Sequence, residues 1–125
     1  MHNQTALAIA ASAALFMVSS VVMAQDADPS YKADPSVYKV VFENQYFRVI
    51  EANKEKGQRD RAHSHPVQSV VYFFTDCSEK LTGPDGQSRN TSNKAGHVVA
   101  PPIVRSHTSE NIGSGACHQL FVERK

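Results

Sequence analysis

The sequence predicts an all-β domain, and three observations support this fold class. Short runs rich in β-branched and aromatic residues recur along the chain, as they do in strands. Turn-forming residues separate these runs at intervals of about eight to twelve residues. After the first 24 residues, no segment has the 3.6-residue apolar period of an amphipathic helix. This combination is typical of β-sandwiches and closed β-barrels.

The first half of the expected domain can be divided into a lead-in and three strands. Residues 25–36 contain two Asp-Pro pairs and no apolar period, which predicts an extended lead-in to a domain of residues 37–125. Tyr38–Phe42 is rich in β-branched and aromatic residues, and Tyr46–Ala52 alternates apolar and polar side chains, so each predicts a strand. Val67–Thr75 is apolar at nearly every position, which predicts a central strand covered on both faces.

The second half contains the clearest turn, Gly83–Gly86, whose Gly-Pro-Asp-Gly sequence suits a tight reversal. We therefore expect Asp76–Thr82 and Gln87–Thr91 to form a hairpin around it. His97–Ala100 is a further strand, which ends because Pro101 and Pro102 cannot donate ladder hydrogen bonds. The last two expected strands are Ile103–Ser109 and Ala116–Glu123, separated by a turn over Asn111–Gly115.

The composition fits one domain and excludes one class of partner. The chain has 125 residues, with 13 Lys and Arg against 12 Asp and Glu, so its formal net charge is +1. No run of Lys or Arg forms a basic patch, and nucleic acid is therefore not an expected partner.

The first 24 residues are chemically unlike the rest. No Lys, Arg, Asp or Glu occurs before Asp26, and Thr5–Ala24 is rich in Ala, Val, Leu and Met. Val22 and Ala24 suit cleavage by signal peptidase after Ala24, although the usual cationic start is missing. We predict a signal peptide over residues 1–24 and a periplasmic or secreted protein. If the segment stays uncleaved, it is a membrane anchor and the expected contact with the membrane.

Two cysteines, Cys77 and Cys117, allow two interpretations. In an oxidising compartment, two thiols in a small domain often form a disulfide. The second interpretation is that Cys77 and Cys117 are two unbonded thiols buried among apolar residues. Since they lack the spacing of Cys-x-x-Cys motifs, a sulfur-rich metal site is not expected.

Three histidines are the strongest candidates for chemistry. His63 and His65 are one residue apart, so on an extended strand their side chains share a face. His107 follows about forty residues later, within reach in a folded sheet. Three neutral imidazoles on one face suit a first-row transition metal. Taken alone, His63 and His65 have an alternative interpretation as two loop histidines that bind nothing. We interpret His97 and His118 as ordinary strand or surface residues.

The spacing around these histidines resembles the two sequence motifs of the cupins. In the first, Gly57 is followed after five residues by His63-Ser64-His65. In the second, Gly96 is followed after five residues by Pro102, then by His107 and Asn111 at the expected spacings. The resemblance implies a jelly-roll barrel, also called a double-stranded β-helix, with a metal held by His63, His65 and His107. It implies a supporting role for Asn111 rather than metal binding.

The chain departs from the cupin motifs at three positions. Ser69 stands where the first motif has a glutamate, and Asp76 and Val104 stand where the motifs have glycine. A serine hydroxyl is a poorer metal ligand than a carboxylate, so we expect a three-histidine site with open coordination positions. Since one anionic ligand is missing, such a site favours an anionic substrate or hydroxide.

The resemblance implies a divalent transition metal, Fe, Mn, Ni or Zn, and a small-molecule ligand. We expect an oxygenase-like metalloenzyme. The alternative is a cupin module that binds metal or a small ligand without turnover. A third interpretation is a structural β-protein with vestigial histidines. The candidate substrate-binding residues are Ser69, Tyr72 and Arg48, although core lining for Tyr72 and surface ion pairing for Arg48 are strong alternatives. Cupins commonly pair through sheet edges, so we also expect a homodimer.

Overall fold

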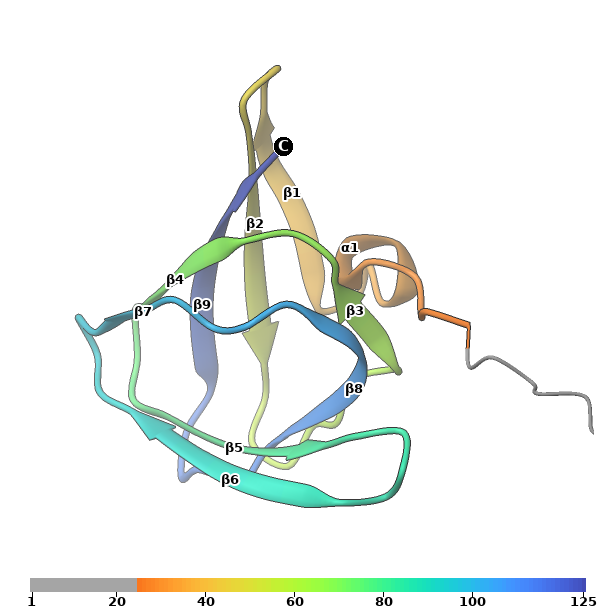
Figure 1. Cartoon of the computed structure of the whole chain (residues 1–125). Helices are drawn as coiled ribbons and strands as arrows, with labels where there is room; N and C mark the ends of the chain where they lie inside the picture. Colours follow the sequence, from red (N-terminus) through yellow and green to blue (C-terminus); the bar gives the residue numbers. More distant parts are fainter. Residues whose placement is uncertain (1–24) are drawn as a thin grey trace, which may run out of the picture.

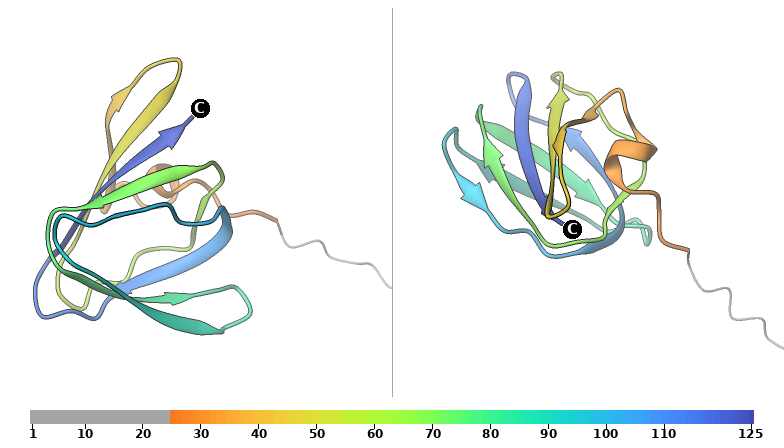
Figure 2. Two further views of the ribbon diagram at one scale, coloured as in Figure 1. Left: turned by 60° about the vertical axis from the view of Figure 1, so that its left-hand side comes forward. Right: turned by 90° about the horizontal axis from the view of Figure 1, so that it is seen from above.

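Two antiparallel sheets face each other across a common interior in this computed structural model, which describes residues 25–125 (Figures 1 and 2). The first sheet has the strand order β1 (Tyr38–Glu43), β2 (Phe47–Lys54), β9 (Cys117–Arg124), β4 (Ser69–Phe73) and β7 (Val98–Val99). The second has the order β3 (His63–His65), β8 (Val104–Asn111), β5 (Cys77–Thr82) and β6 (Ser88–Asn93). The all-β prediction is confirmed for these residues. The predicted signal peptide lies outside them.

Alternation along β9 shows how the sequence builds the barrel. Cys117, Gln119 and Phe121 face the interior and are buried, and the residues between them are only partly covered. β2 pairs with β9 along its whole length, and its inner face carries Ile50 and Ala52. The buried apolar core consists of Val37, Tyr38, Ile50, Ala52, Val71, Phe73, Cys77, Cys117 and Phe121.

A disulfide between Cys77 and Cys117 decides between the two interpretations of the cysteines. Cys77 begins β5 and Cys117 begins β9, so the bond joins the two sheets at one end of the barrel. The two residues are 40 positions apart. Closing a loop of this length in the unfolded chain corresponds to a stabilisation of about 4 kcal/mol in the chain-entropy description.

The prediction of an extended lead-in over residues 25–36 was wrong for part of this segment, because residues Ser30–Ala33 form the short helix α1. Pro29 ends the extended part, and its carbonyl accepts hydrogen bonds from the backbone N–H groups of Lys32 and Ala33. The Asp34 carboxylate then accepts a backbone N–H from Arg61, which holds the turn against the barrel. One helical turn is too short to show an apolar period, and contacts distant in sequence stabilise it. Within residues 25–125 no helix has the length and hydropathy to cross a bilayer.

The prediction for Val67–Thr75 was wrong in one respect. The strand there is β4, and only its inner face, with Val71 and Phe73, is buried. Its outer face leaves Val70 and Tyr72 about 40% exposed. No second layer covers this side of the sheet in the described part of the chain, so an apolar run here marks an uncovered face and not a doubly covered strand.

Candidate metal centre

The three predicted histidines converge. β3 carries His63 and His65, β8 carries His107, and antiparallel pairing places His63 directly opposite His107. Each offers a ring nitrogen within 4.8 Å of the others. The Nε2 atom of His63 lies 3.2 Å from that of His65 and 3.0 Å from that of His107. For metal–nitrogen bonds of about 2.1 Å, ligands at adjacent octahedral positions lie about 3.0 Å apart, so these separations fit one shared ion.

Protein contacts orient the imidazole rings of His63 and His65 so that their Nε2 atoms point toward the place where the three histidines converge. His63 Nδ1 lies 2.8 Å from the Arg61 carbonyl oxygen, and an N–H at Nδ1 donates to that oxygen. This hydrogen bond leaves the Nε2 lone pair free for a metal, as is usual for histidine ligands. The His65 ring stacks on Phe121, with centroids 5.1 Å apart and planes 5° from parallel. Two of the three rings are therefore held in orientation by protein contacts.

Burial keeps the three imidazoles neutral. A positive ring is poorly solvated in the interior, and this lowers the pKa of His63 despite the nearby Asp60 charge. Burial, together with repulsion from a charged His63, lowers the pKa values of His65 and His107 to about 3 and about 4. A metal therefore meets unprotonated nitrogens at neutral pH, which is the state that binds. The residues present fit a divalent transition metal; their chemistry alone does not select one.

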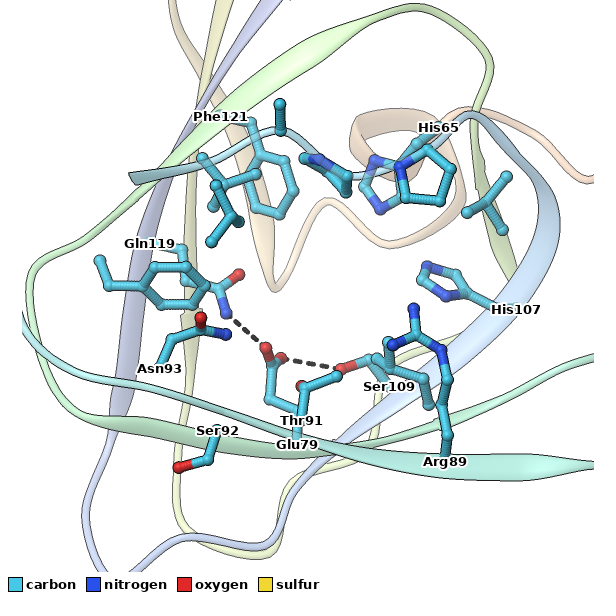
Figure 3. A pocket seen from close by; sticks show the side chains of 18 of the residues that line it. His65, Glu79, Arg89, Thr91, Ser92, Asn93, His107, Ser109, Gln119 and Phe121 are labelled. Carbon is cyan, nitrogen blue, oxygen red and sulfur yellow. Dashed lines mark hydrogen bonds between the residues drawn. The ribbon is translucent and has the colours of Figure 1, made fainter. Parts of the chain in front are cut away.

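A cavity of about 460 Å³ opens beside the histidines (Figure 3). His65 and His107 line it, whereas His63 is fully buried behind them. One wall is apolar and the floor is polar. The apolar lining includes Val71, Phe73, Leu81, Val99, Pro101, Pro102, Val104 and Phe121, and the polar lining includes Tyr38, Glu79, Ser109 and Gln119. A space of this size and character is typical of a site for a small organic molecule.

A buried ionic network, which the sequence analysis missed, lies under the cavity. The Lys54 ammonium is 1% exposed and donates to Glu79 Oε1 at 2.5 Å and to the Ser109 hydroxyl. It also lies 3.4 Å from Asp60 Oδ2. Gln119 Nε2 donates to the second Glu79 oxygen at 2.6 Å. Burial raises the pKa of Glu79, but attraction to Lys54 and these hydrogen bonds outweigh it, so the pKa is lowered and the carboxylate stays ionised.

Tyr38 links this network to the histidines. Its hydroxyl donates to Asp60 Oδ2 at 2.7 Å and lies 3.3 Å from His63 Nε2. The other Asp60 oxygen accepts the backbone N–H of Ser109 on β8. Burial first, and the Asp60 charge second, raise the pKa of Tyr38 well above its ordinary value, so the phenol remains protonated. The same carboxylate therefore holds Tyr38 and the strand that carries His107.

Comparisons with known proteins identify the fold. No family model matches the chain, and no curated protein matches its sequence. A cupin domain from Bordetella pertussis Tohama I is similar in structure, with a TM-score of 0.65 and 20% identity, over 82% of this chain and 98% of that one. An RmlC-like cupin with a double-stranded β-helix from Methanocaldococcus jannaschii has a TM-score of 0.56 and 17% identity, over 87% and 93%. This chain has the cupin fold. The jelly-roll prediction is thus confirmed.

Part of a larger enzyme is also similar in structure. Oxalate decarboxylase from Bacillus subtilis, a protein described with Mn(II) centres, matches with a TM-score of 0.50 and 23% identity. The match covers 64% of this chain and 22% of the decarboxylase, so this chain corresponds to about a fifth of that protein's length.

The three predicted substrate-binding residues do not line the cavity beside the histidines. Tyr72 lies on the outer face of β4 and packs edge-on against Phe74, because its strand parity is opposite to that of Val71. Arg48 pairs with Glu43 and sits over the Tyr31 ring at 4.3 Å. Ser69 lies opposite Glu123 of β9 and lines another depression of the surface. We therefore assign none of the three to this cavity.

Asn111 has the supporting position that the cupin resemblance implies. It is buried at the end of β8, and its amide donates to the carbonyl oxygens of Lys54 and Gly115. Of the two histidines interpreted as ordinary, His97 is exposed, and His118 pairs with Glu51 at 2.6 Å on the sheet's outer side. Neither contributes to the three-histidine cluster.

We expect Lys54→Met to destabilise the domain by about 3–5 kcal/mol, because it leaves the Glu79 and Asp60 carboxylates buried without a cation. Chemical denaturation measures the free energy of unfolding. The matched control is Lys94→Met, which removes an exposed ammonium paired with Asp76 and should leave stability within experimental error. Equal stability of the two variants would contradict a structural role for the buried network.

Proposed function

We propose that this protein is an exported cupin that binds one divalent transition metal through His63, His65 and His107 and acts on a small molecule in the adjoining cavity, as an oxygenase-like enzyme. The observation that carries the proposal is the convergence of three neutral imidazoles at the wall of a cavity large enough for an organic ligand. The Mn(II) centres of oxalate decarboxylase support metal chemistry in this fold. Candidate metals are Fe, Mn, Ni and Zn.

The residues around the cavity have different roles in the proposed function. A metal at the three imidazoles supplies Lewis acidity or oxygen activation. The apolar wall, formed by residues such as Phe73 and Phe121, excludes water and contacts the organic part of a ligand. The Tyr38 hydroxyl stays protonated beside His63 and is held there by Asp60. Glu79 is the only carboxylate among the residues that line the cavity.

The alternative is a cupin module that binds metal or a small ligand without turnover. Glu79 favours it, because both of its oxygens already accept hydrogen bonds from Lys54, Ser109 and Gln119. A carboxylate so engaged, with a lowered pKa, is a weak proton acceptor. If the protein does catalyse a reaction, the metal must therefore contribute most of the chemistry.

We expect purified protein to contain about one equivalent of transition metal by elemental analysis after dialysis. His107→Ala should remove most of this metal and retain the β-sheet circular-dichroism spectrum, since His107 is a ligand at the cavity wall and not a core residue. His97→Ala is the control and should keep full occupancy. Folded wild-type protein without metal, even after incubation with each candidate ion, would overturn the proposed function.

Export through a cleaved N-terminal signal is part of the proposal, and the disulfide supports it, because such bonds persist mainly in oxidising compartments. We expect protein isolated from the periplasm or medium to have the intact mass of residues 25–125 with one disulfide. Full-length protein retained in the membrane fraction would instead favour the anchor.

We also propose that two copies pair through the outer face of the five-stranded sheet. This face exposes the apolar side chains of Phe42, Phe47, Val70, Tyr72, Phe74 and Val98. Light scattering should give twice the monomer mass for the wild type, and Tyr72→Lys should shift the protein toward monomer by placing a charge in the contact. Ser114→Lys, which adds the same charge at an exposed turn, should remain dimeric. A monomeric wild type would disprove the pairing.

A further inference from the structure

Arg89 occupies the inner face of the second sheet, at the mouth of the cavity. Leu81 of β5 pairs with Arg89 on one side and with Ser109 of β8 on the other, so the three form one row across the sheet. Two strand spacings separate Arg89 from Ser109, about 10 Å, which is within reach of an extended arginine side chain. His107 is on the same strand face as Ser109, two residues earlier. Figure 3 shows the Arg89 guanidinium directed into the cavity on the side of His107.

Within residues 25–125, the Arg89 side chain has no ion pair and no hydrogen bond, whereas the other charged groups at the cavity are engaged. Glu79 is satisfied by Lys54, Ser109 and Gln119, and Lys54 is shared between Glu79 and Asp60. The guanidinium therefore keeps its five N–H donors for solvent or a ligand. A divalent ion at three neutral imidazoles would add further positive charge at the inner end. The free charge facing the cavity is positive.

The wall that faces the Arg89 side chain from the first sheet is apolar, and this limits the class of anion. Val71, Phe73 and Phe121 line the cavity there. A small inorganic anion gains nothing from such a wall, because its hydration is lost without apolar contact in return. A single unpaired guanidinium also suits one unit of negative charge, and its planar fork matches a carboxylate in a bidentate contact.

We propose that Arg89 is the carboxylate-binding residue of this cavity and that the ligand is a small organic carboxylate with an apolar body. The carboxylate contacts Arg89 on the side of His107 (Figure 3), and the apolar body lies across the cavity against Phe73 and Phe121. The inference deepens the proposed function by naming the ligand class of the same cavity, and it rests on that proposal for the metal at the inner end.

Titration calorimetry with metal-loaded protein tests the inference, using phenylacetate, 3-phenylpropanoate and 4-phenylbutanoate, each beside its neutral amide, with acetate as the ligand without an apolar body. At least one phenyl carboxylate should bind at least tenfold more tightly than its amide and than acetate. Arg89→Gln should weaken that carboxylate at least tenfold and leave the amide unchanged, which shows that the apolar wall is intact. Arg105→Gln, which removes an exposed arginine outside the cavity, should change neither.

Three results would overturn the inference: no binding by any member of the series, equal binding of acid and amide, or equal affinity of wild type and Arg89→Gln. The last result, with binding lost on metal removal, would assign the carboxylate to the metal instead. The metal content of each sample separates the two proposals. A sample with one equivalent of metal and no Arg89-dependent binding refutes only the ligand class. Folded protein that stays metal-free but binds carboxylates through Arg89 refutes only the metal centre.

Discussion

The buried ammonium of Lys54 is the interaction on which the candidate site depends. It compensates two carboxylates in the barrel interior, Glu79 on β5 and Asp60 before β3, and either would be costly to bury alone. Asp60 also accepts hydrogen bonds from Tyr38 and from the backbone of Ser109. The same charge balance therefore holds the strand that carries His107 and the phenol beside His63. The geometry of the three imidazoles thus follows from electrostatic compensation one layer below them.

The cavity of this protein has two chemically distinct ends. The inner end presents imidazoles that burial keeps from taking up a second proton, and the outer end presents a guanidinium with no protein partner among the described residues. Apolar side chains from β4 and β9 face both groups from the opposite sheet. The disulfide joins the first residues of β5 and β9, the strands that carry Glu79 and Gln119. It therefore holds these two side chains together at the cavity floor. Fold, charge and covalent linkage therefore converge on one cavity.

Particular residues show why sequence reasoning found the histidines and missed their surroundings. His63, His65 and His107 were recognisable because metal ligation restricts residue type and spacing along two strands. Lys54 and Glu79 carried a weaker signal: each occupies the inward parity of its strand, Lys54 after Ile50 and Ala52, and Glu79 after Cys77. A single buried charge on such a face gives no indication of its partner. The partners of Lys54 are Asp60 in the loop before β3, Glu79 on β5 and Ser109 on β8, which lie 6, 25 and 55 residues away, and only the folded barrel brings them together.

The amino-acid sequence by itself determined the all-β class, most strand positions, the hairpin around Gly83–Gly86 and the three-histidine cluster, because local backbone preference and motif spacing are properties of neighbouring residues. Only the tertiary structure decided that Cys77 and Cys117 are bonded, that residues 30–33 form a helical turn, and that Tyr72 faces outward while Arg89 faces the cavity. These outcomes depend on which strands pair and in which register, and register is set by packing and charge compensation between segments distant in the chain.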